Sequence, residues 1–331
     1  MLLHRMKCEA IRVAKHVLRP SRRRTRPHAL ILLYHRIDQP RVDPWNLCVS
    51  RENFRAHLDV LRGLCEFVPL SAIPDLISAG RPQARTPVAI TFDDGYLDNL
   101  TNALPELRAA GAPATIFLAT GWIGRPQGFW WDRLAALVFD SGPLPRRIEV
   151  PFGNETFCWR SGLGNERRAR AALHRSLWQR CQVLPEEHRE ATLAALEACI
   201  PPLRRHEAAR PMHPDEVREM HASGVMSIGA HTVTHRPMTA LNAHEQETEI
   251  VRSREACRDL TGVTPTCFAY PYGEVAEISP RLVEKSGFSL ACGTDEELVW
   301  PGRERFLLPR VSVGNLDAVR FERWLTRTWL R

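Results

Sequence analysis

"AITFDDGYLDN", residues 89–99, is the stretch that decides how this chain folds. An apolar run leads up to Asp93 and Asp94, and Gly95 and a helix-like segment follow. The pattern predicts a buried strand that ends in two adjacent carboxylates. Because neighbouring carboxylates repel each other when both are ionised, their place at a strand end indicates a chemical role.

Similar apolar runs recur along the chain and alternate with amphipathic segments of helix length. The predicted strands are residues 29–35, 87–93, 114–120, 225–231, 266–271, 288–292 and 305–313. Helices are predicted from Ser50 to about Gly63, from near Leu97 to Gly111, and from a capping box at Asn242 and Glu245 to Gly262. This alternation predicts an α/β fold with a largely parallel sheet.

Several predicted strands end in residues capable of chemistry: His35, the Asp93–Asp94 pair, His231 and 270–272. Active sites of parallel α/β folds and barrels lie beyond the carboxyl ends of the strands, so this coincidence indicates a barrel-like enzyme. Residues 122–211 interrupt the pattern with Arg-rich helical sequence and one strand-like stretch, RRIEVPF. We predict that they form an insertion over part of the barrel rim.

Composition indicates a soluble globular protein: 331 residues are 44% hydrophobic and 25% charged. The sequence holds no run of eighteen apolar residues, no secretion signal and no CxxC pair among its nine cysteines, so a cytoplasmic protein with reduced thiols is expected.

Residues 1–28 are predicted to be a basic arm, because arginines and lysines crowd this segment. Its apolar residues have helical spacing, which is compatible with a helix on an anionic membrane surface; a solvated tail is the alternative. The arm has no aromatic residues for base stacking, so no nucleic acid is expected as a partner.

Two further stretches predict functional groups at the rim. In "GAHTVTH", His231 and His235 are four residues apart, so both imidazoles can reach one ion, and a carboxylate would complete the ligand set of a hydrolytic metal site. In "FAYPYGE", Tyr272 and Gly273 can bring a backbone N–H close to an oxyanion; an ordinary turn is the alternative.

TFDDG (91–95), HTVTH (231–235) and PYG (271–273), in this order, resemble the motifs of the polysaccharide deacetylases, carbohydrate esterase family 4. The resemblance extends over roughly residues 29–315 without the insertion. It implies a distorted (β/α) barrel of about seven strands and a divalent cation, usually zinc, that serves hydrolysis of an acetyl group from a sugar. It also implies that Asp93 is the general base.

The same resemblance makes Asp94, His231 and His235 the metal ligands and gives the backbone N–H of Tyr272 to the oxyanion. The late Leu-x-His motif of many relatives is absent, because the last predicted strand, FLLPRVSV, has no histidine. His35 is our candidate acid, since the first strand of a closed barrel lies beside the last. This looks like the permuted arrangement of the biofilm poly-N-acetylglucosamine deacetylases; a structural histidine is the alternative.

A second departure is Ala269, where many relatives carry an arginine that orients the catalytic aspartate. Arg310 in the last strand is a candidate replacement, because its guanidinium can bind a carboxylate through two hydrogen bonds; a solvated rim arginine is the alternative.

Near the same rim, "GFWWDRL" (128–134) offers an aromatic platform and a hydrogen-bond acceptor. Trp131 and Asp132, together with Tyr270, are our candidates for contacts with substrate. The tryptophan pair Trp130 and Trp131 can equally serve to anchor the insertion to the barrel.

The sequence as a whole predicts a metal-dependent hydrolase that removes an acetyl group from an N-acetylated sugar of a cell-envelope polysaccharide, glycolipid or precursor. A lipid-linked or nucleotide-linked sugar would fit a cytoplasmic, possibly membrane-associated protein. The alternatives are a deformylase or O-acetyl esterase on the same site, or a catalytically silent glycan-binding module.

Overall fold

The computed structural model describes residues 27–80, 84–160, 166–200 and 210–330. The predicted basic arm falls outside this range except for residues 27 and 28, so its contact with a membrane stays a prediction. None of the helices in the described ranges is both long enough and apolar enough to cross a membrane.

A parallel sheet forms the centre of the molecule, with the strand order β11-β10-β9-β6-β5-β1-β12 and β4 added against β5. Its strands are β1 (Leu30–Tyr34), β4 (Cys65–Phe67), β5 (Thr86–Phe92), β6 (Ala114–Leu118), β9 (Met226–Ala230), β10 (Cys267–Ala269), β11 (Leu290–Cys292) and β12 (Val311–Ser312). Residues of β1, β5 and β6 are buried almost throughout, as expected of parallel strands covered on both faces.

One short segment closes the sheet. Leu308 pairs with Cys292 at the end of β11, and Val311 pairs with Leu32 in β1, so residues 308–312 contact both ends of the strand order. The prediction that the first strand lies beside the last is therefore confirmed. The predicted strand 305–313 was too long, because Pro309 has no N–H for a ladder and the paired run shrinks to β12.

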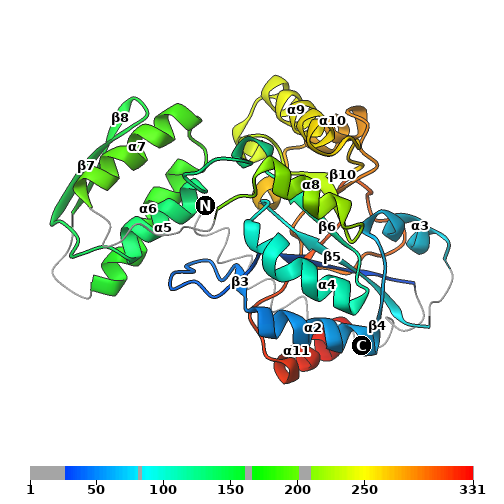
Figure 1. The fold of residues 1–331 in the computed structure, drawn as a ribbon. Coiled ribbons are helices and arrows are strands. Elements are labelled where there is room, and N and C mark those ends of the chain that lie inside the picture. The colour runs from blue at the N-terminus through cyan, green and yellow to red at the C-terminus, as the bar shows by residue number, and fades with distance from the viewer. Residues whose placement is uncertain (1–26, 81–83, 161–165, 201–209, 331) are drawn as a thin grey trace.

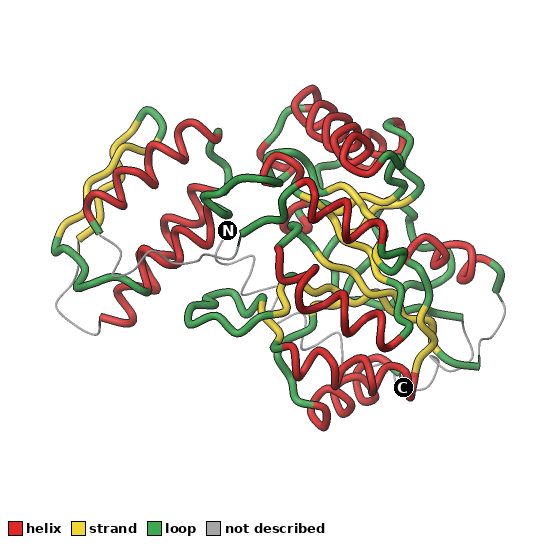
Figure 2. Tube along the Cα trace, in the orientation of Figure 1, coloured by secondary structure: helices red, strands yellow, loops and turns green. Residues whose placement is uncertain are grey.

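Helices cover the outside of this sheet (Figure 2). They are α2 (Arg51–Leu64), α3 (Ile73–Ser78), α4 (Leu104–Ala110), α8 (Pro214–Ala222), α9 (Ala243–Thr261), α10 (Ser279–Lys285) and α11 (Ala318–Trp324), with short turns η2 (Leu70–Ala72), η3 (Asn99–Ala103), η4 (Thr120–Trp122), η5 (Met238–Ala240), η6 (Pro271–Gly273) and η7 (Leu325–Trp329). Ser50 caps α2 and Asn242 opens α9 with a capping box, as predicted. The predicted helix after Asp94 begins instead with the wider turn η3.

Residues 129–160 and 166–200 form what we call the α5–α7 lobe, which lies to one side of the barrel in Figure 1. It consists of α5 (Trp130–Phe139), the antiparallel strands β7 (Arg147–Phe152) and β8 (Glu155–Arg160), α6 (Glu166–Cys181) and α7 (Glu186–Cys199). These elements share a hydrophobic cluster of their own, which includes Trp122 and Tyr96 from the barrel side.

A loop from the barrel contacts this lobe. The short strands β2 (Arg36–Ile37) and β3 (Cys48–Val49) pair with each other, and the loop between them carries Trp45 onto Trp178 of α6, with ring centroids 4.5 Å apart. The barrel and the lobe thus meet near the carboxyl end of β1.

Candidate active site

The carboxyl ends of β5 and β9 bring Asp94, His231 and His235 together. Asp94 Oδ1 lies 3.2 Å from His235 Nε2 and 3.8 Å from His231 Nε2, and the two Nε2 atoms are 3.2 Å apart. One ligand atom from each residue lies within 4.8 Å of the other two, which is the spacing a single ion requires. All three side chains are buried.

The chemistry of these three residues fits a divalent cation. Asp94 Oδ1 is buried and has no hydrogen-bond partner among the described residues. His231 Nδ1–H donates to the Ala269 carbonyl at 2.7 Å, which leaves the lone pair of Nε2 available to a metal. Burial lowers the pKa of His231 to about 4 and that of His235 to about 3, so both rings are neutral ligands at pH 7. Two imidazoles and one carboxylate suit zinc.

The backbone around this cluster is strained. Five non-glycine residues of the described chain have positive φ angles, and four of them are Asp94 (76°), Thr232 (63°), His235 (59°) and Tyr272 (59°). Each such residue costs of order 1–3 kcal/mol and persists where the surrounding structure imposes it, commonly at functional sites. The strain is concentrated at the three loops that present the polar groups.

Asp93 points to a different partner from Asp94. Arg310 Nη1 and Nη2 each donate to one Asp93 carboxylate oxygen at 2.7 Å, while Arg310 Nε donates to the Gly293 carbonyl at 2.9 Å. Burial alone would raise the pKa of Asp93, but the Arg310 charge outweighs it and holds that pKa below its usual range. Asp93 is therefore ionised at neutral pH, with Oδ2 at 3.8 Å from His231 Nε2.

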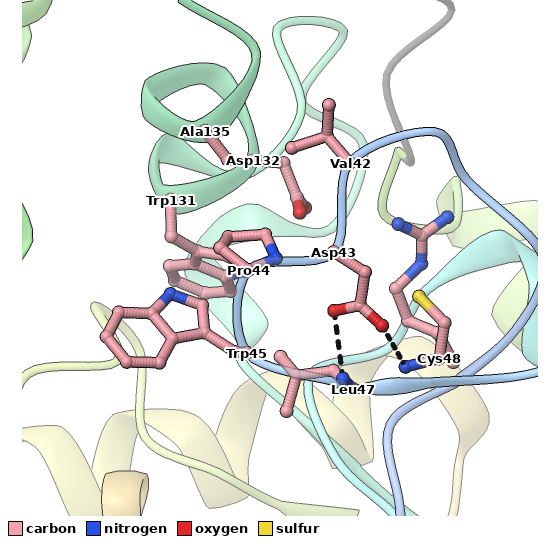
Figure 3. Close-up of a pocket in the computed structure, with 10 residues that line it drawn as sticks. Val42, Asp43, Pro44, Trp45, Leu47, Cys48, Trp131, Asp132 and Ala135 are labelled. Carbon is pink, nitrogen blue, oxygen red and sulfur yellow. Dashed lines mark hydrogen bonds between the residues drawn. The ribbon is translucent and has the colours of Figure 1, made fainter. Parts of the chain in front are cut away.

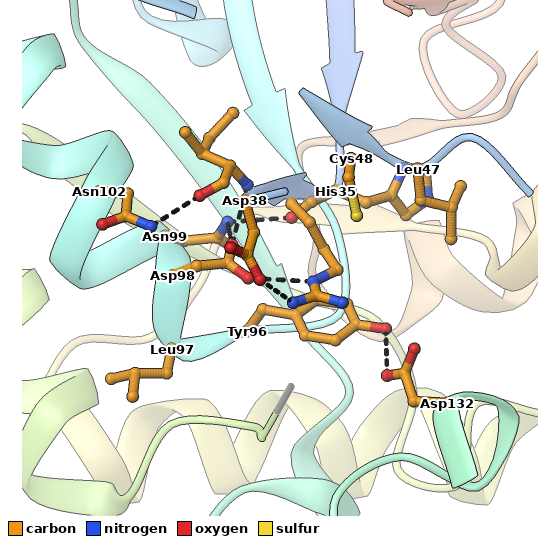
Figure 4. Close-up of polar contacts among 12 residues, drawn as sticks. His35, Asp38, Leu47, Cys48, Tyr96, Leu97, Asp98, Asn99, Asn102 and Asp132 are labelled. Atoms are coloured by element: carbon orange, nitrogen blue, oxygen red, sulfur yellow. Dashed lines mark hydrogen bonds and ion pairs between the residues drawn. The ribbon is translucent and has the colours of Figure 1, made fainter. Parts of the chain in front are cut away.

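His35 follows β1 on the same rim and is half-buried. Asn99 Nδ2 donates to the His35 carbonyl at 2.9 Å, which fixes the chain at this point (Figure 4). Burial lowers the pKa of His35, and the charges of Asp94 and Asp93 oppose that shift.

Figure 4 also shows a polar network that sequence reasoning missed. The Arg36 guanidinium pairs with Asp98 at 3.0 Å and Asp38 at 2.6 Å, and it lies 4.9 Å from the centre of the Tyr96 ring. Tyr96 O–H donates to Asp132 at 2.9 Å. Burial raises the pKa of Asp132 to about 7. Tyr96 stands in the opening sequence quoted above, but nothing in that stretch indicates its partners.

Trp131 joins this network to the metal-ligand cluster. Its Nε1–H donates to Tyr96 Oη at 2.6 Å, and its ring lies 4.8 Å from the His235 ring, measured between centroids. Trp131 and Asp132 also line a small cavity of about 10 Å³ under the Trp45 loop (Figure 3), enough for roughly one water molecule. The structure thus brings both residues to the edge of the site.

The two tyrosines predicted at this rim have different surroundings. Tyr270 is fully buried and donates its O–H to the Phe306 carbonyl at 3.0 Å, so the structure places it in the core and not among the residues that face the cluster. Strand alternation at the end of β10 turns it inward. The Tyr272 ring lies 4.6 Å from the His235 ring and 5.6 Å from Trp178 of α6.

Comparison with known proteins assigns the family. The polysaccharide deacetylase family model matches residues 80–142 and 174–291, which is more than half of the chain. The chain belongs to the polysaccharide deacetylase family. The predicted membership is confirmed, and with it the class of enzyme, a carbohydrate-directed hydrolase.

One curated relative and two solved structures each match most of this chain. "Putative polysaccharide deacetylase YxkH" of Bacillus subtilis is 22% identical over 286 residues, 86% of this chain and 71% of that protein. The Streptococcus pyogenes deacetylase PplD, solved with acetate, is 18% identical with a TM-score of 0.59, covering 92% of this chain and 99% of that one. IcaB from Ammonifex degensii is 20% identical with a TM-score of 0.58, covering 90% and 97%. The shared fold confirms the predicted distorted (β/α) barrel.

Proposed function

We propose that this polysaccharide deacetylase family member uses a divalent cation, most simply Zn²⁺, to remove the acetyl group from an N-acetylated sugar of the cell envelope. The observation that carries the proposal is the Asp94, His231 and His235 cluster beside an Asp93 that is ionised and held separately by Arg310. A cation bound there would lower the pKa of a coordinated water and polarise the acetyl carbonyl.

The residues of the chain take the remaining steps. Asp93 accepts the proton of the attacking water, because its carboxylate is ionised and Arg310 fixes its orientation. The backbone N–H of Tyr272 donates to the developing oxyanion. His35 gives a proton to the departing amine, since β1 places it on the same rim as the aspartates. Trp131 and Asp132 contact the sugar.

Metal analysis of the purified protein, followed by measurement of acetate release from N-acetylglucosamine oligomers, tests the proposal. Wild-type protein should bind one equivalent of metal and release acetate, and Asp93→Asn should keep the metal and lose turnover. Release that is unaffected by Asp93→Asn would contradict the mechanism. Formate release or ester cleavage without amide cleavage would favour a deformylase or O-acetyl esterase, and bound metal without any hydrolysis would favour a glycan-binding module.

Other predictions about the whole chain remain proposals. We propose that residues 29–331 form the catalytic unit, interrupted at about 122–211, and that the basic arm of residues 1–28 favours contact with an anionic membrane or a lipid-linked or nucleotide-linked sugar. The Helicobacter pylori peptidoglycan deacetylase, 36% identical over 61 residues that make up 18% of this chain and 21% of that protein, supports a cell-envelope substrate.

A further inference from the structure

Arg189 of α7 carries a buried charge that no hydrogen-bond acceptor of the described chain contacts. The residue is 0% exposed, and none of its three guanidinium nitrogens has a hydrogen-bond partner among the described residues. A desolvated ion without a partner costs several kcal/mol, so such an arrangement is rarely kept for stability alone.

The contacts that Arg189 does make leave its N–H groups free. The guanidinium carbon lies 5.5 Å from the centre of the Trp122 ring and 5.3 Å from that of Trp130, and both rings offer π-faces but no strong acceptors. The acidic neighbours on α7 bind elsewhere: Glu186 pairs with Arg125, and Glu190 pairs with Arg133. The charge of Arg189 is therefore available to a ligand.

The position of Arg189 ties it to the metal-ligand cluster. Trp122, which Arg189 contacts, lies against Trp131, with ring centroids 5.8 Å apart, and Trp131 packs on His235. The Tyr272 ring packs against the same hydrophobic cluster, which contains Trp122 and Trp130. The Tyr272 hydroxyl is itself buried and has no hydrogen-bond partner in the described part of the chain.

We propose that Arg189, with the hydroxyl of Tyr272, binds an oxyanion of the substrate, a phosphate or a carboxylate carried next to the acetylated amine. The proposal rests on the proposed deacetylase function and names the substrate class: an anionic N-acetylated sugar. A planar guanidinium binds a carboxylate or phosphate through two parallel hydrogen bonds, and Tyr272 O–H adds a donor. A neutral hydroxyl would leave the buried charge uncompensated.

Aromatic side chains cover the metal-ligand cluster. Asp94, His231 and His235 are each at most 5% exposed, so a substrate that reaches them must displace part of their aromatic cover. Trp131 and Tyr272 form that cover over His235.

The test compares matched sugars with the metal-loaded enzyme: N-acetylglucosamine, N-acetylglucosamine 1-phosphate and N-acetylmuramic acid, which carries a carboxylate. We expect the wild type to favour at least one anionic sugar, and Arg189→Met to reduce the ratio of kcat/KM for that sugar to kcat/KM for the neutral sugar at least tenfold, mainly through KM. If the kcat/KM ratio falls for N-acetylglucosamine 1-phosphate, the subsite binds phosphate. If it falls for N-acetylmuramic acid, the subsite binds a carboxylate. Arg133→Met, which removes another arginine of the lobe, should leave the ratio unchanged.

A wild type that treats all three sugars alike, or an Arg189→Met variant that slows all of them equally, would overturn the proposal. Should the Met variant fail to fold, Arg189→Lys supplies the comparison, because it keeps the charge but loses the planar fork; the ratio should then fall severalfold, and an unchanged ratio would count against the subsite.

Phosphate binding is measured separately from acetate release, so that a failure of the proposed deacetylase function can be distinguished from a failure of the Arg189 subsite. If no sugar releases acetate, the thermal shift with inorganic phosphate still tests the subsite: phosphate should raise the Tm of the metal-loaded wild type more than that of Arg189→Met. Equal shifts would show that Arg189 binds no oxyanion. Phosphate bound to the metal contributes equally to both proteins.

Discussion

Arg310 holds Asp93 through two parallel hydrogen bonds of 2.7 Å, and the two side chains are 0% and 4% exposed. The pair joins β5 to the last strand of the barrel. It also separates the two adjacent aspartates by function, because Asp93 faces a permanent cation while Asp94 faces two imidazoles. Arg310 keeps Asp93 ionised, whereas burial raises the pKa of Asp94, whose two imidazole neighbours are neutral.

Replacing Arg310 by Met should lower kcat at least a hundredfold while the metal content stays unchanged, because Asp93 loses its orientation and its low pKa. It should also cost about 3–5 kcal/mol of unfolding free energy, since a buried carboxylate is left unpaired. Kinetics, metal analysis and urea unfolding measure the three effects. Arg320→Met is the control, because Arg320 is exposed and pairs with Asp317 on the surface. Arg310→Lys offers a milder variant, and unchanged kcat in both would refute the orienting role.

Substitution of the proposed metal ligands should abolish metal binding and show how much the bound metal stabilises the fold. His235→Ala and Asp94→Asn should each lose most of the bound metal and all measurable acetate release, and a chelator should lower the Tm of the wild type but not of these variants. Elemental analysis and calorimetry give the readouts. His244→Ala, at an exposed position on α9, should behave as wild type. Full metal content in both ligand variants would place the ion elsewhere.

His35→Asn should lose turnover of N-acetylated sugars and keep its metal, because an amine cannot leave without a proton. An aryl acetate ester needs no such proton, since its phenolate is a good leaving group. The ratio of ester to amide hydrolysis should therefore rise at least tenfold in the variant. Equal loss on both substrates would assign His35 a positioning role instead.

Acid should destabilise the metal-free protein before its carboxylates titrate. Burial lowers the pKa of His174 to about 4, from a usual value near 6.5, and it lies in the lobe away from the metal ligands. A lowered folded-state pKa means that the unfolded chain binds the proton more tightly, so stability is complete above pH 6.5 and falls as pH decreases toward 4.

At pH 5 the expected loss from this one histidine is about 2 kcal/mol relative to pH 7. Urea unfolding of metal-free wild type and His174→Leu at both pH values measures it. The variant should lose correspondingly less stability between the two pH values. An identical pH dependence would show that His174 is protonated or solvated in the folded protein.

The helices and strands that could be predicted from the sequence are those marked by neighbouring residues. Apolar runs identified each long strand of the sheet, and caps such as Ser50 and Asn242 marked helix starts, because hydrophobic burial and capping depend on neighbouring residues. β12 was predicted too long and β8 was missed. β12 has only two residues and depends on pairing with the distant strand β1, and β8 has six residues that follow β7 through a short turn; periodicity reveals neither pairing.

Dependence on local signals also explains which residues of the candidate site could be predicted from the sequence. Motif spacing brought out Asp94, His231 and His235, whereas Arg36 and Arg189 were missed because an arginine in a polar stretch is expected to face water. Their burial depends on tertiary contacts with Tyr96 and with two tryptophans. Tyr270 was assigned to the rim from its place after a strand, but its side chain turns into the core.

Residues 308–312 both close the barrel and carry Arg310, and this has a consequence during synthesis. The segment follows all three proposed metal ligands in the sequence, because Arg310 comes after Asp94, His231 and His235. Until it emerges, β1 lacks its β12 neighbour and Asp93 lacks the Arg310 guanidinium, although the nascent chain already contains every proposed metal ligand. On the proposed mechanism, the general base is therefore oriented only by the same step that closes the barrel.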